Sequence, residues 1–275
     1  MSKSILTVLS EYGYWGEELV GPLAAFDRRG YEVTFATPTG GRAHALPPSM
    51  DPEYVDPPLG RSVTTPEVAE ATRKLDESDR LDNPLSIEEL IPDRPYFSEP
   101  DFLRRIEAYH RELDTAQRSL LERYDALVLV GGSGPIVDMA NNGRLHEIVL
   151  AFHRADRPIL GLCYGVTPLA FAREWEQRDS ILRGKHVTGH PKEYDYKAGT
   201  GFLGTDFNIG AVPYPLEYIL RDATAPDGRF HGNVGKETSV IVDYPFVTAR
   251  STPDSFLGGE KLVEMLEHGL RRYGW

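Results

Sequence analysis

Short apolar runs alternate with helical patterns along most of this chain, and this alternation constrains its fold more than any other feature. The runs at Ile5–Leu9, Tyr31–Ala36, Asp125–Val130 and Arg157–Leu162 are typical of buried strands. Apolar residues at helical spacing separate them. Because parallel strands need a connection that crosses the sheet, helices between strands indicate parallel pairing. We therefore expect an α/β fold, a three-layer sandwich around a mostly parallel central sheet.

The rest of the chain supplies further helices and shorter strands. The most regular helical pattern begins at Phe102 and ends at Leu120, where apolar residues recur every three or four positions. The remaining expected helices are one that carries Leu19, Leu23 and Phe26 and stops near Gly30, and those at Leu145–Phe152, Thr167–Trp175 and Ser255–Tyr273. The shorter expected strands are His186–Thr188, Ser239–Val242 and Phe246–Thr248.

One segment interrupts the alternation. The stretch 47–100 holds ten of the 21 prolines, and residues 51–100 carry a net charge of −8 out of −12 for the chain. We expect an acidic insertion at about 45–100, with few regular elements, within a single domain over 1–275. A solvated connection is the simpler interpretation, and a lid or a dimer contact is the functional alternative.

Composition excludes several classes of protein. A single cysteine cannot form an internal disulfide or a cysteine-rich metal cluster, and no H-E-x-x-H pattern occurs, so we expect neither metal nor cofactor. The acidic balance argues against nucleic acid as a partner. The apolar stretch Ile5–Leu9 is too short for a signal-peptide core, and no segment has the apolar length of a membrane span. We expect a cytoplasmic protein with a small-molecule substrate.

The single cysteine lies in a pattern typical of a nucleophile. Gly161-Leu162-Cys163-Tyr164-Gly165 has the G-x-nucleophile-x-G spacing, with an expected strand before it and an expected helix after it. A sharp strand-to-helix turn exposes the central side chain, and small flanking residues relieve the crowding. The helix amino terminus favours thiolate over thiol. An inert buried cysteine is the alternative, but the context favours the nucleophile.

Ligands of parallel sheets bind at the carboxyl ends of the strands, and other candidate residues fall there. Gly131 and Gly132 follow the strand 125–130 and could bring backbone N–H groups to an oxyanion. Glu18, in the first turn of a helix, is either a partner of the helix dipole or a proton carrier. His190 follows the strand 186–188 and is the histidine best placed to act as a base.

Five segments in order resemble the ThiJ/PfpI superfamily of DJ-one-like proteins. They are Glu18–Pro22, the glycine-rich turn at 127–135, the elbow at 159–166, the histidine segment at 187–191 and the closing segment at 246–256. The resemblance covers the chain apart from about 45–100 and parts of 196–236. It implies a flavodoxin-like fold of the class I glutamine amidotransferase type, a homodimer, and no cofactor.

The resemblance also assigns roles. It implies that Cys163 is the nucleophile, Glu18 its carboxylic partner and His190 the general base. The backbone donors to the oxyanion would be Gly132 and Tyr164, and the substrate contacts would be Gly131, Ser133 and Arg250.

Two departures narrow the function. Heat-inducible glyoxalase chaperones of the superfamily have histidine where this chain has Tyr164, which leaves only the arrangement with His190. The late His-x-Glu pair of glutamine amidotransferases is absent, since Gly269 and Leu270 follow His268, so glutamine hydrolysis is not expected. We expect a cysteine enzyme that is similar to glyoxalases and deglycases and converts an α-oxoaldehyde to a 2-hydroxy acid. The alternatives are a cysteine hydrolase or hydratase for an amide or isonitrile, and a redox-sensing or chaperone-like protein.

Overall fold

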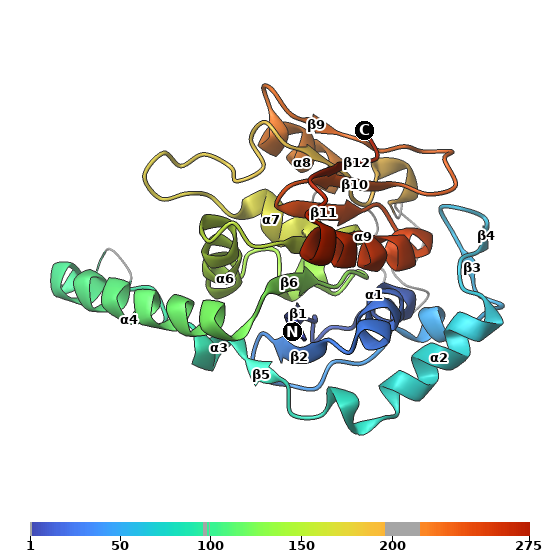
Figure 1. Cartoon of the computed structure of the whole chain (residues 1–275), viewed down its shortest axis with the longest axis horizontal. Coiled ribbons are helices and arrows are strands. Elements are labelled where there is room, and N and C mark those ends of the chain that lie inside the picture. The colour runs from blue at the N-terminus through green and yellow to red at the C-terminus, as the bar shows by residue number, and fades with distance from the viewer. Residues whose placement is uncertain (1, 96–97, 99, 196–214) are drawn as a thin grey trace.

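The computed structural model describes residues 2–95, 98, 100–195 and 215–275. Within these ranges eight strands form one sheet, in the order β12-β10-β11-β7-β6-β1-β2-β5 (Figure 1). The strands from β11 to β5 pair in parallel, and β10 pairs antiparallel with both of its neighbours. Their bounds are β1 Ser4–Val8, β2 Glu32–Thr37, β5 Leu85–Ser86, β6 Ala126–Leu129, β7 Ile159–Leu162, β10 Val240–Asp243, β11 Phe246–Ala249 and β12 Arg272–Tyr273. The predicted mostly parallel sheet is confirmed.

Helices cover both faces of the sheet, which gives the predicted three layers (Figure 1). One face carries α1 (Gly16–Arg29) and α9 (Ser255–His268), and the other carries α4 (Phe102–Arg123), α6 (Gly143–Arg154), α7 (Thr167–Phe171) and α8 (Leu216–Thr224). Successive strand residues point to opposite faces, so Ile5 joins the core under α1 and α9 while Leu6 joins the other core. Each face of the sheet is therefore a separate hydrophobic core.

Glycines let α1 and α9 approach closely. A Cβ atom at Gly21 would lie 2.8 Å from the Phe256 backbone nitrogen, and one at Gly259 would lie 2.6 Å from the Cα of Pro22. The helix α1 ends where Gly30 takes a left-handed φ of +66°, which glycine adopts without strain. This tight pair holds the amino-terminal end of α1 against the sheet rim.

The insertion contains more regular structure than predicted. The chain there forms η1 (Pro47–Met50), β3 (Val55–Asp56), β4 (Arg61–Ser62), α2 (Pro66–Asp76), η2 (Asp79–Leu81) and α3 (Ile87–Leu90). Thr65 caps α2 by accepting from the Val68 N–H, and proline at the first helical position suits the fixed φ of that turn. Asp76, the last residue of α2, accepts from the Tyr14 hydroxyl at 3.1 Å and the Ala45 N–H at 2.7 Å. The insertion is thus fixed to the loop after β1.

Some predicted bounds were wrong. The last helix ends at His268 because Gly269 is left-handed at φ +68°, and the chain returns as β12 along β10. The helix after the elbow is shorter than predicted and is preceded by the 3₁₀ turn η3 (Cys163–Val166). The strand β8 (His186–Val187) pairs with β9 (Arg229–Phe230) in a separate sheet.

A few short elements were not predicted. They are α5 (Pro135–Asp138), η4 (Lys192–Tyr194), η5 (Thr252–Asp254), β9 and α8. None of the helices in the described ranges combines the length and the apolar character that a membrane crossing requires.

Candidate active site

The elbow at the end of β7 holds Cys163 in a strained conformation. Its φ of +51° lies in the left-handed region, which a residue with a Cβ rarely occupies. The flanking glycines are required by close packing: a Cβ at Gly165 would lie 2.3 Å from the Leu129 carbonyl oxygen, and one at Gly161 would lie 2.9 Å from Val166. Backbone strain of this kind clusters at functional sites. The observed strain therefore supports the prediction that Cys163 is a functional residue.

Three strand ends bring the predicted residues together. The loop after β1 leads into Glu18, the loop after β6 contains Gly131 and Gly132, and β7 ends at Cys163. A Cβ at Gly131 would lie 2.1 Å from Glu18 Oε2 and 2.9 Å from the Cys163 Cβ, so the carboxyl and the thiol meet across this glycine. Gly131 thus has a spacing role: no larger residue would leave room for both groups.

The predicted base lies beside the sulfur. The Sγ atom of Cys163 is 3.3 Å from Nδ1 of His190, within the range of a hydrogen bond to sulfur. The other ring nitrogen, Nε2, is 3.5 Å from Oδ1 of Asp195. The Nε2 atom has no hydrogen-bond partner among the described residues, so the Asp195 carboxylate lies beside the imidazole as a nearby charge and not as a hydrogen-bonded partner.

Two residues near His190 have roles that the sequence analysis missed. Asp195 was not a candidate, although it follows His190 by only five residues. Tyr164 was predicted only as a backbone donor, but its ring stacks on the His190 imidazole with centroids 4.3 Å apart. Its hydroxyl also donates to Asp195. An acidic residue soon after a predicted base is the one sequence signal that could have pointed to Asp195.

Burial decides the protonation states. It raises the pKa of Glu18 to about 8 and lowers the pKa of His190 to about 4, so at neutral pH the carboxyl is protonated and the imidazole is neutral. Burial also raises the pKa of the Cys163 thiol, and the Glu18 carboxyl beside it acts in the same direction. Asp195, with a pKa raised by burial to about 6, is ionised at neutral pH.

The resting state is therefore a neutral thiol beside a neutral imidazole. This differs from the expectation that the helix amino terminus favours thiolate. The helix that follows, α7, has five residues and begins only after the turn η3, so its dipole is weak at the sulfur. The cost of removing the Cys163 thiolate from water outweighs the effect of this dipole on the pKa of the thiol.

Both predicted oxyanion donors point at the reacting sulfur. The backbone N–H groups of Gly132 and Tyr164 donate to Cys163, and each stabilises its ionised form. Gly132 has a φ of +95°, and a Cβ there would lie 2.5 Å from the Trp15 backbone nitrogen. Only glycine lets this N–H reach the site.

A pocket of about 820 Å³ opens over these residues. Its floor is formed by Glu18, Gly132, Cys163 and His190, and the predicted substrate contact Ser133 also lines it. One wall comes from the insertion, where the β3–β4 hairpin and the following residues run from Asp56 to Pro66. The insertion thus contributes to the pocket wall, and its action as a lid stays a prediction.

The predicted substrate contact Arg250 also lines the pocket, but its guanidinium is engaged elsewhere. It donates to the carbonyl oxygens of Asn233, Lys236 and Glu237 and forms an ion pair with Asp254 at 3.3 Å. The side chain is only 2% exposed. In this structure Arg250 fixes the loop that forms the second wall, and its contact with substrate stays a prediction.

The described residues contain no group of three or more His, Cys, Asp and Glu side chains placed to hold a metal ion. The chemistry available at the site is that of a thiol, an imidazole, a carboxylic acid and two backbone donors.

Fold and site together define an α/β protein of the flavodoxin-like type, with a cysteine on the elbow after a central parallel strand. The family model described as ThiJ/PfpI family-like matches residues 9–199, and the chain belongs to this family. The resemblance stated from the sequence is thereby confirmed.

Relatives agree with this assignment. The glutamine amidotransferase-like class 1 domain-containing protein 1 of Bos taurus is 30% identical over 141 residues, which are 51% of this chain and 59% of that protein. The match thus spans about three-fifths of the length of that relative. Rapid Encystment Protein 24 KDa of Francisella tularensis has a similar structure, with a TM-score of 0.66 and 20% identity over 96% of this chain and 99% of that one. Glyoxalase III of Candida albicans also has a similar structure, with a TM-score of 0.59 and 15% identity over 95% of this chain and 96% of that one.

Proposed function

We propose that this protein is a cofactor-free cysteine enzyme that acts on small carbonyl compounds, with a glyoxalase-like conversion of an α-oxoaldehyde to a 2-hydroxy acid as its reaction. The observation that carries the proposal is the set of groups around Cys163: a base at 3.3 Å, a carboxylic acid beside the thiol and two backbone donors. One structural relative is a glyoxalase III, and this agrees with the proposal.

The first step forms a bond between sulfur and the aldehyde carbon. His190 Nδ1 takes the thiol proton as Cys163 attacks, and the carbonyl oxygen becomes an alkoxide that the N–H groups of Gly132 and Tyr164 stabilise. The protonated Glu18 can donate its proton to that oxygen. The product of the step is a neutral hemithioacetal, with Glu18 now a carboxylate.

The next steps move a proton and add water. The Glu18 carboxylate moves the proton from the former aldehyde carbon to the neighbouring carbon, while the hydroxyl proton passes to the neighbouring carbonyl oxygen, which gives a thioester. The imidazolium formed at His190 in the first step returns its proton to Glu18. Neutral His190 then takes a proton from water as the water attacks the thioester, and it passes this proton to the sulfur as the 2-hydroxy acid leaves and the thiol is restored. The overall change is the addition of one water, so no oxidant or reductant is needed.

The pocket favours a substrate larger than methylglyoxal. Its volume of about 820 Å³ lies within the range of sites for drug-sized ligands. The hydroxyls of Ser133 and Thr64, both on pocket-lining residues, are buried without a hydrogen-bond partner among the described residues. Each can rotate toward a polar substrate, so we propose an oxoaldehyde with hydroxyl groups on its chain.

The test is turnover by the purified protein. Methylglyoxal and a sugar-derived oxoaldehyde are supplied in parallel, and loss of aldehyde and formation of 2-hydroxy acid are followed. We expect turnover by the wild type, a higher kcat/KM for the hydroxylated substrate, and loss of turnover in Cys163→Ala. Turnover that survives in Cys163→Ala would refute the mechanism. Faster turnover of an amide or isonitrile would favour the hydrolase or hydratase alternative instead.

A further inference from the structure

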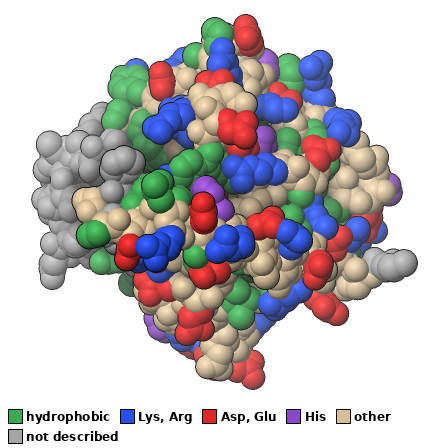
Figure 2. All heavy atoms as spheres, turned by 90° about the vertical axis from the view of Figure 1, so that its left-hand side faces the viewer, with side chains coloured by type: hydrophobic (Ala, Val, Ile, Leu, Met, Phe, Trp, Pro, Cys, Tyr) green, Lys and Arg blue, Asp and Glu red, His purple; other side chains and the backbone are tan. Residues whose placement is uncertain are grey.

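A second cleft lies away from the active site and shares none of its lining residues. It has a volume of about 400 Å³ and is enclosed by α4, the beginning of α6, the segment 171–178 and the stretch 92–94. Figure 2 shows the side of the molecule from which α4 projects in Figure 1, where basic and acidic side chains are interspersed. The lining includes four arginines, which are Arg94, Arg144, Arg173 and Arg178.

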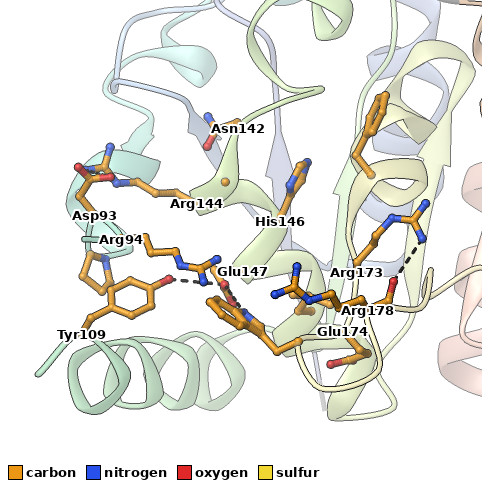
Figure 3. A pocket seen from close by; sticks show the side chains of 15 residues that line it. Asp93, Arg94, Tyr109, Asn142, Arg144, His146, Glu147, Arg173, Glu174 and Arg178 are labelled. Carbon is orange, nitrogen blue, oxygen red and sulfur yellow. Dashed lines mark hydrogen bonds and ion pairs between the residues drawn. The ribbon is translucent and has the colours of Figure 1, made fainter. Parts of the chain in front are cut away.

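The arginines come from two opposite walls. Figure 3 shows Arg94 and Arg144 on one side of the cleft and Arg173 and Arg178 on the other, with the side chains of His146 and Glu147 between them. A ligand in the cleft would therefore meet guanidinium groups from both sides.

Two of the three carboxylates in the lining are already bound. Glu147 is buried and accepts from the Trp175 indole N–H at 3.2 Å. Glu174 accepts from Arg154 at 2.7 and 3.0 Å, and Arg154 lies outside the cleft. Both carboxylates are thus hydrogen-bonded to other groups, and the four arginines of the lining outnumber its three carboxylates.

The four arginines differ in their partners. Arg144 forms ion pairs with Asp93 and Glu88, both at 3.7 Å, while its Nε atom is buried without a hydrogen-bond partner among the described residues. Within the described residues, neither Arg173 nor Arg178 forms an ion pair. The Arg173 guanidinium donates there only to the Arg178 carbonyl oxygen, at 3.4 Å. The cleft therefore has unused donors on both walls.

One guanidinium is held in place by an aromatic ring and not by a carboxylate. Arg94 stacks over the Trp175 ring at 3.3 Å from the centroid, and Trp175 is itself fixed by its bond to Glu147. The amino terminus of α6 adds a partial positive charge, since this helix begins at Gly143 in the cleft lining.

From this arrangement we infer that the cleft binds the phosphate group of a small phosphorylated metabolite, held between Arg144 on one wall and Arg178 on the other. Guanidinium groups bind phosphate oxygens with two parallel hydrogen bonds. A phosphate monoester presents oxygens in several directions and can use both walls at once, whereas a planar carboxylate is matched to one guanidinium. The volume leaves room for a body of a few carbon atoms beside the phosphate.

Calorimetric titration of the purified full chain tests the inference, with glycerol phosphate, inorganic phosphate, glycerol and acetate as probes. We expect saturable binding of the two phosphates at near-physiological salt, and no binding of glycerol or acetate. The double variant R144Q/R178Q should weaken binding about tenfold or more. The matched control R118Q removes an exposed arginine of α4 that pairs with Asp114, and it should change the affinity by less than about twofold.

The single variant R178Q serves as a control for misfolding, because the Arg178 side chain is exposed and forms no ion pair within the described ranges. It should keep the wild-type melting temperature and still weaken binding. The inference is overturned if no phosphate binds saturably, if acetate binds as well as phosphate, or if R118Q weakens binding as much as the double variant. Cys163→Ala should bind phosphate unchanged, which makes this test independent of the proposed enzyme activity.

Discussion

Tyr164, the residue directly after the candidate nucleophile, positions the base through two contacts. Its ring covers one face of the His190 imidazole, and its hydroxyl donates to Asp195, which lies 3.5 Å from the other imidazole nitrogen. The Tyr164 hydroxyl donates to the carboxylate, whereas the imidazole lies 3.3 Å from the sulfur, so we assign the role of base to His190 and a positioning role to Tyr164.

This geometry predicts the reactivity of the thiol without any knowledge of the substrate. In Asp195→Asn the imidazole loses the carboxylate that favours its protonated form, so it accepts the Cys163 proton less readily. We expect alkylation by iodoacetamide at pH 7 to slow about tenfold, the effect of about one pKa unit. Cys163 is the only cysteine in the chain, so labelling reports on it alone.

Two comparisons separate this effect from a general loss of structure. The matched control is Asp179→Asn, since Asp179 pairs with Arg183 and not with His190. This variant should leave the alkylation rate unchanged. The pH at which alkylation is half-maximal should also shift in Asp195→Asn, which a purely structural defect would not produce. Equal rates in wild type and Asp195→Asn would show that the carboxylate has no part in activating the thiol.

At the scale of elements, the β3–β4 hairpin connects the insertion with the site. Asp56, Arg61 and Ser62 line the pocket, while the helix α2 that follows packs beside α1, where a Cβ at Gly16 would lie 2.2 Å from Thr72. The hairpin is thus a wall supported by a fixed base. It touches the pocket without contributing to the chemistry at Cys163.

Replacing 55–62 by a short Gly-Ser linker should open the pocket. We expect the KM for an oxoaldehyde to rise about tenfold with a smaller change in kcat, because the lid holds substrate and does not react with it. Alkylation of Cys163 gives a second measurement: relative to the wild type, the variant should react faster with both reagents, and the increase in rate should be larger for a bulky maleimide than for iodoacetamide. If both reagents gain equally, or if neither does, the hairpin does not limit access to the site.

Local signals explain which elements could be predicted. The strands β1, β6 and β7 and the elbow carry their information in a few neighbouring residues: a buried apolar run, then glycines that only a tight turn requires. Gly269 was likewise a local signal for the end of α9, but the apolar residues beyond it led to the prediction of a longer helix.

The missed features depend on contacts between distant segments. Asp195 gains its role only when β8 and the following turn place it beside Tyr164, 31 positions earlier in the chain. The wall formed by the hairpin depends on how α2 packs against α1. Val55-Asp56-Pro57-Pro58-Leu59-Gly60-Arg61 does contain turn residues between short extended segments, so the hairpin itself was accessible to sequence reasoning, although its position over the site was not.

For the whole molecule, the buried ionisable groups of the site determine how stability depends on pH. Burial raises the pKa of Glu18 and of the neighbouring Glu17 from 4.5 to about 8. Between these values the folded chain binds more protons than the unfolded chain, so rising pH costs stability. Burial lowers the pKa of His190 and His231 from 6.5 to about 4, so their contribution is complete above pH 6.5 and is lost as pH falls toward 4.

The two effects oppose each other between pH 4.5 and 6.5, where Asp195, with a pKa raised from 3.8 to about 6, adds to the effect of the glutamates; of these groups, the two glutamates alone act between pH 6.5 and 8. We therefore expect the melting temperature to change little over the lower range and to fall by several degrees over the upper one, at about 2–4 °C for each kcal/mol lost. Glu18→Gln, which resembles the protonated acid, should make the fall about half as steep, since Glu17 still titrates. Glu112→Gln, on the exposed face of α4, should follow the wild type. Differential scanning calorimetry across pH 5–8.5 measures the slopes, and a wild-type melting temperature that rises between pH 6.5 and 8 would show that Glu18 is not held protonated in the folded protein.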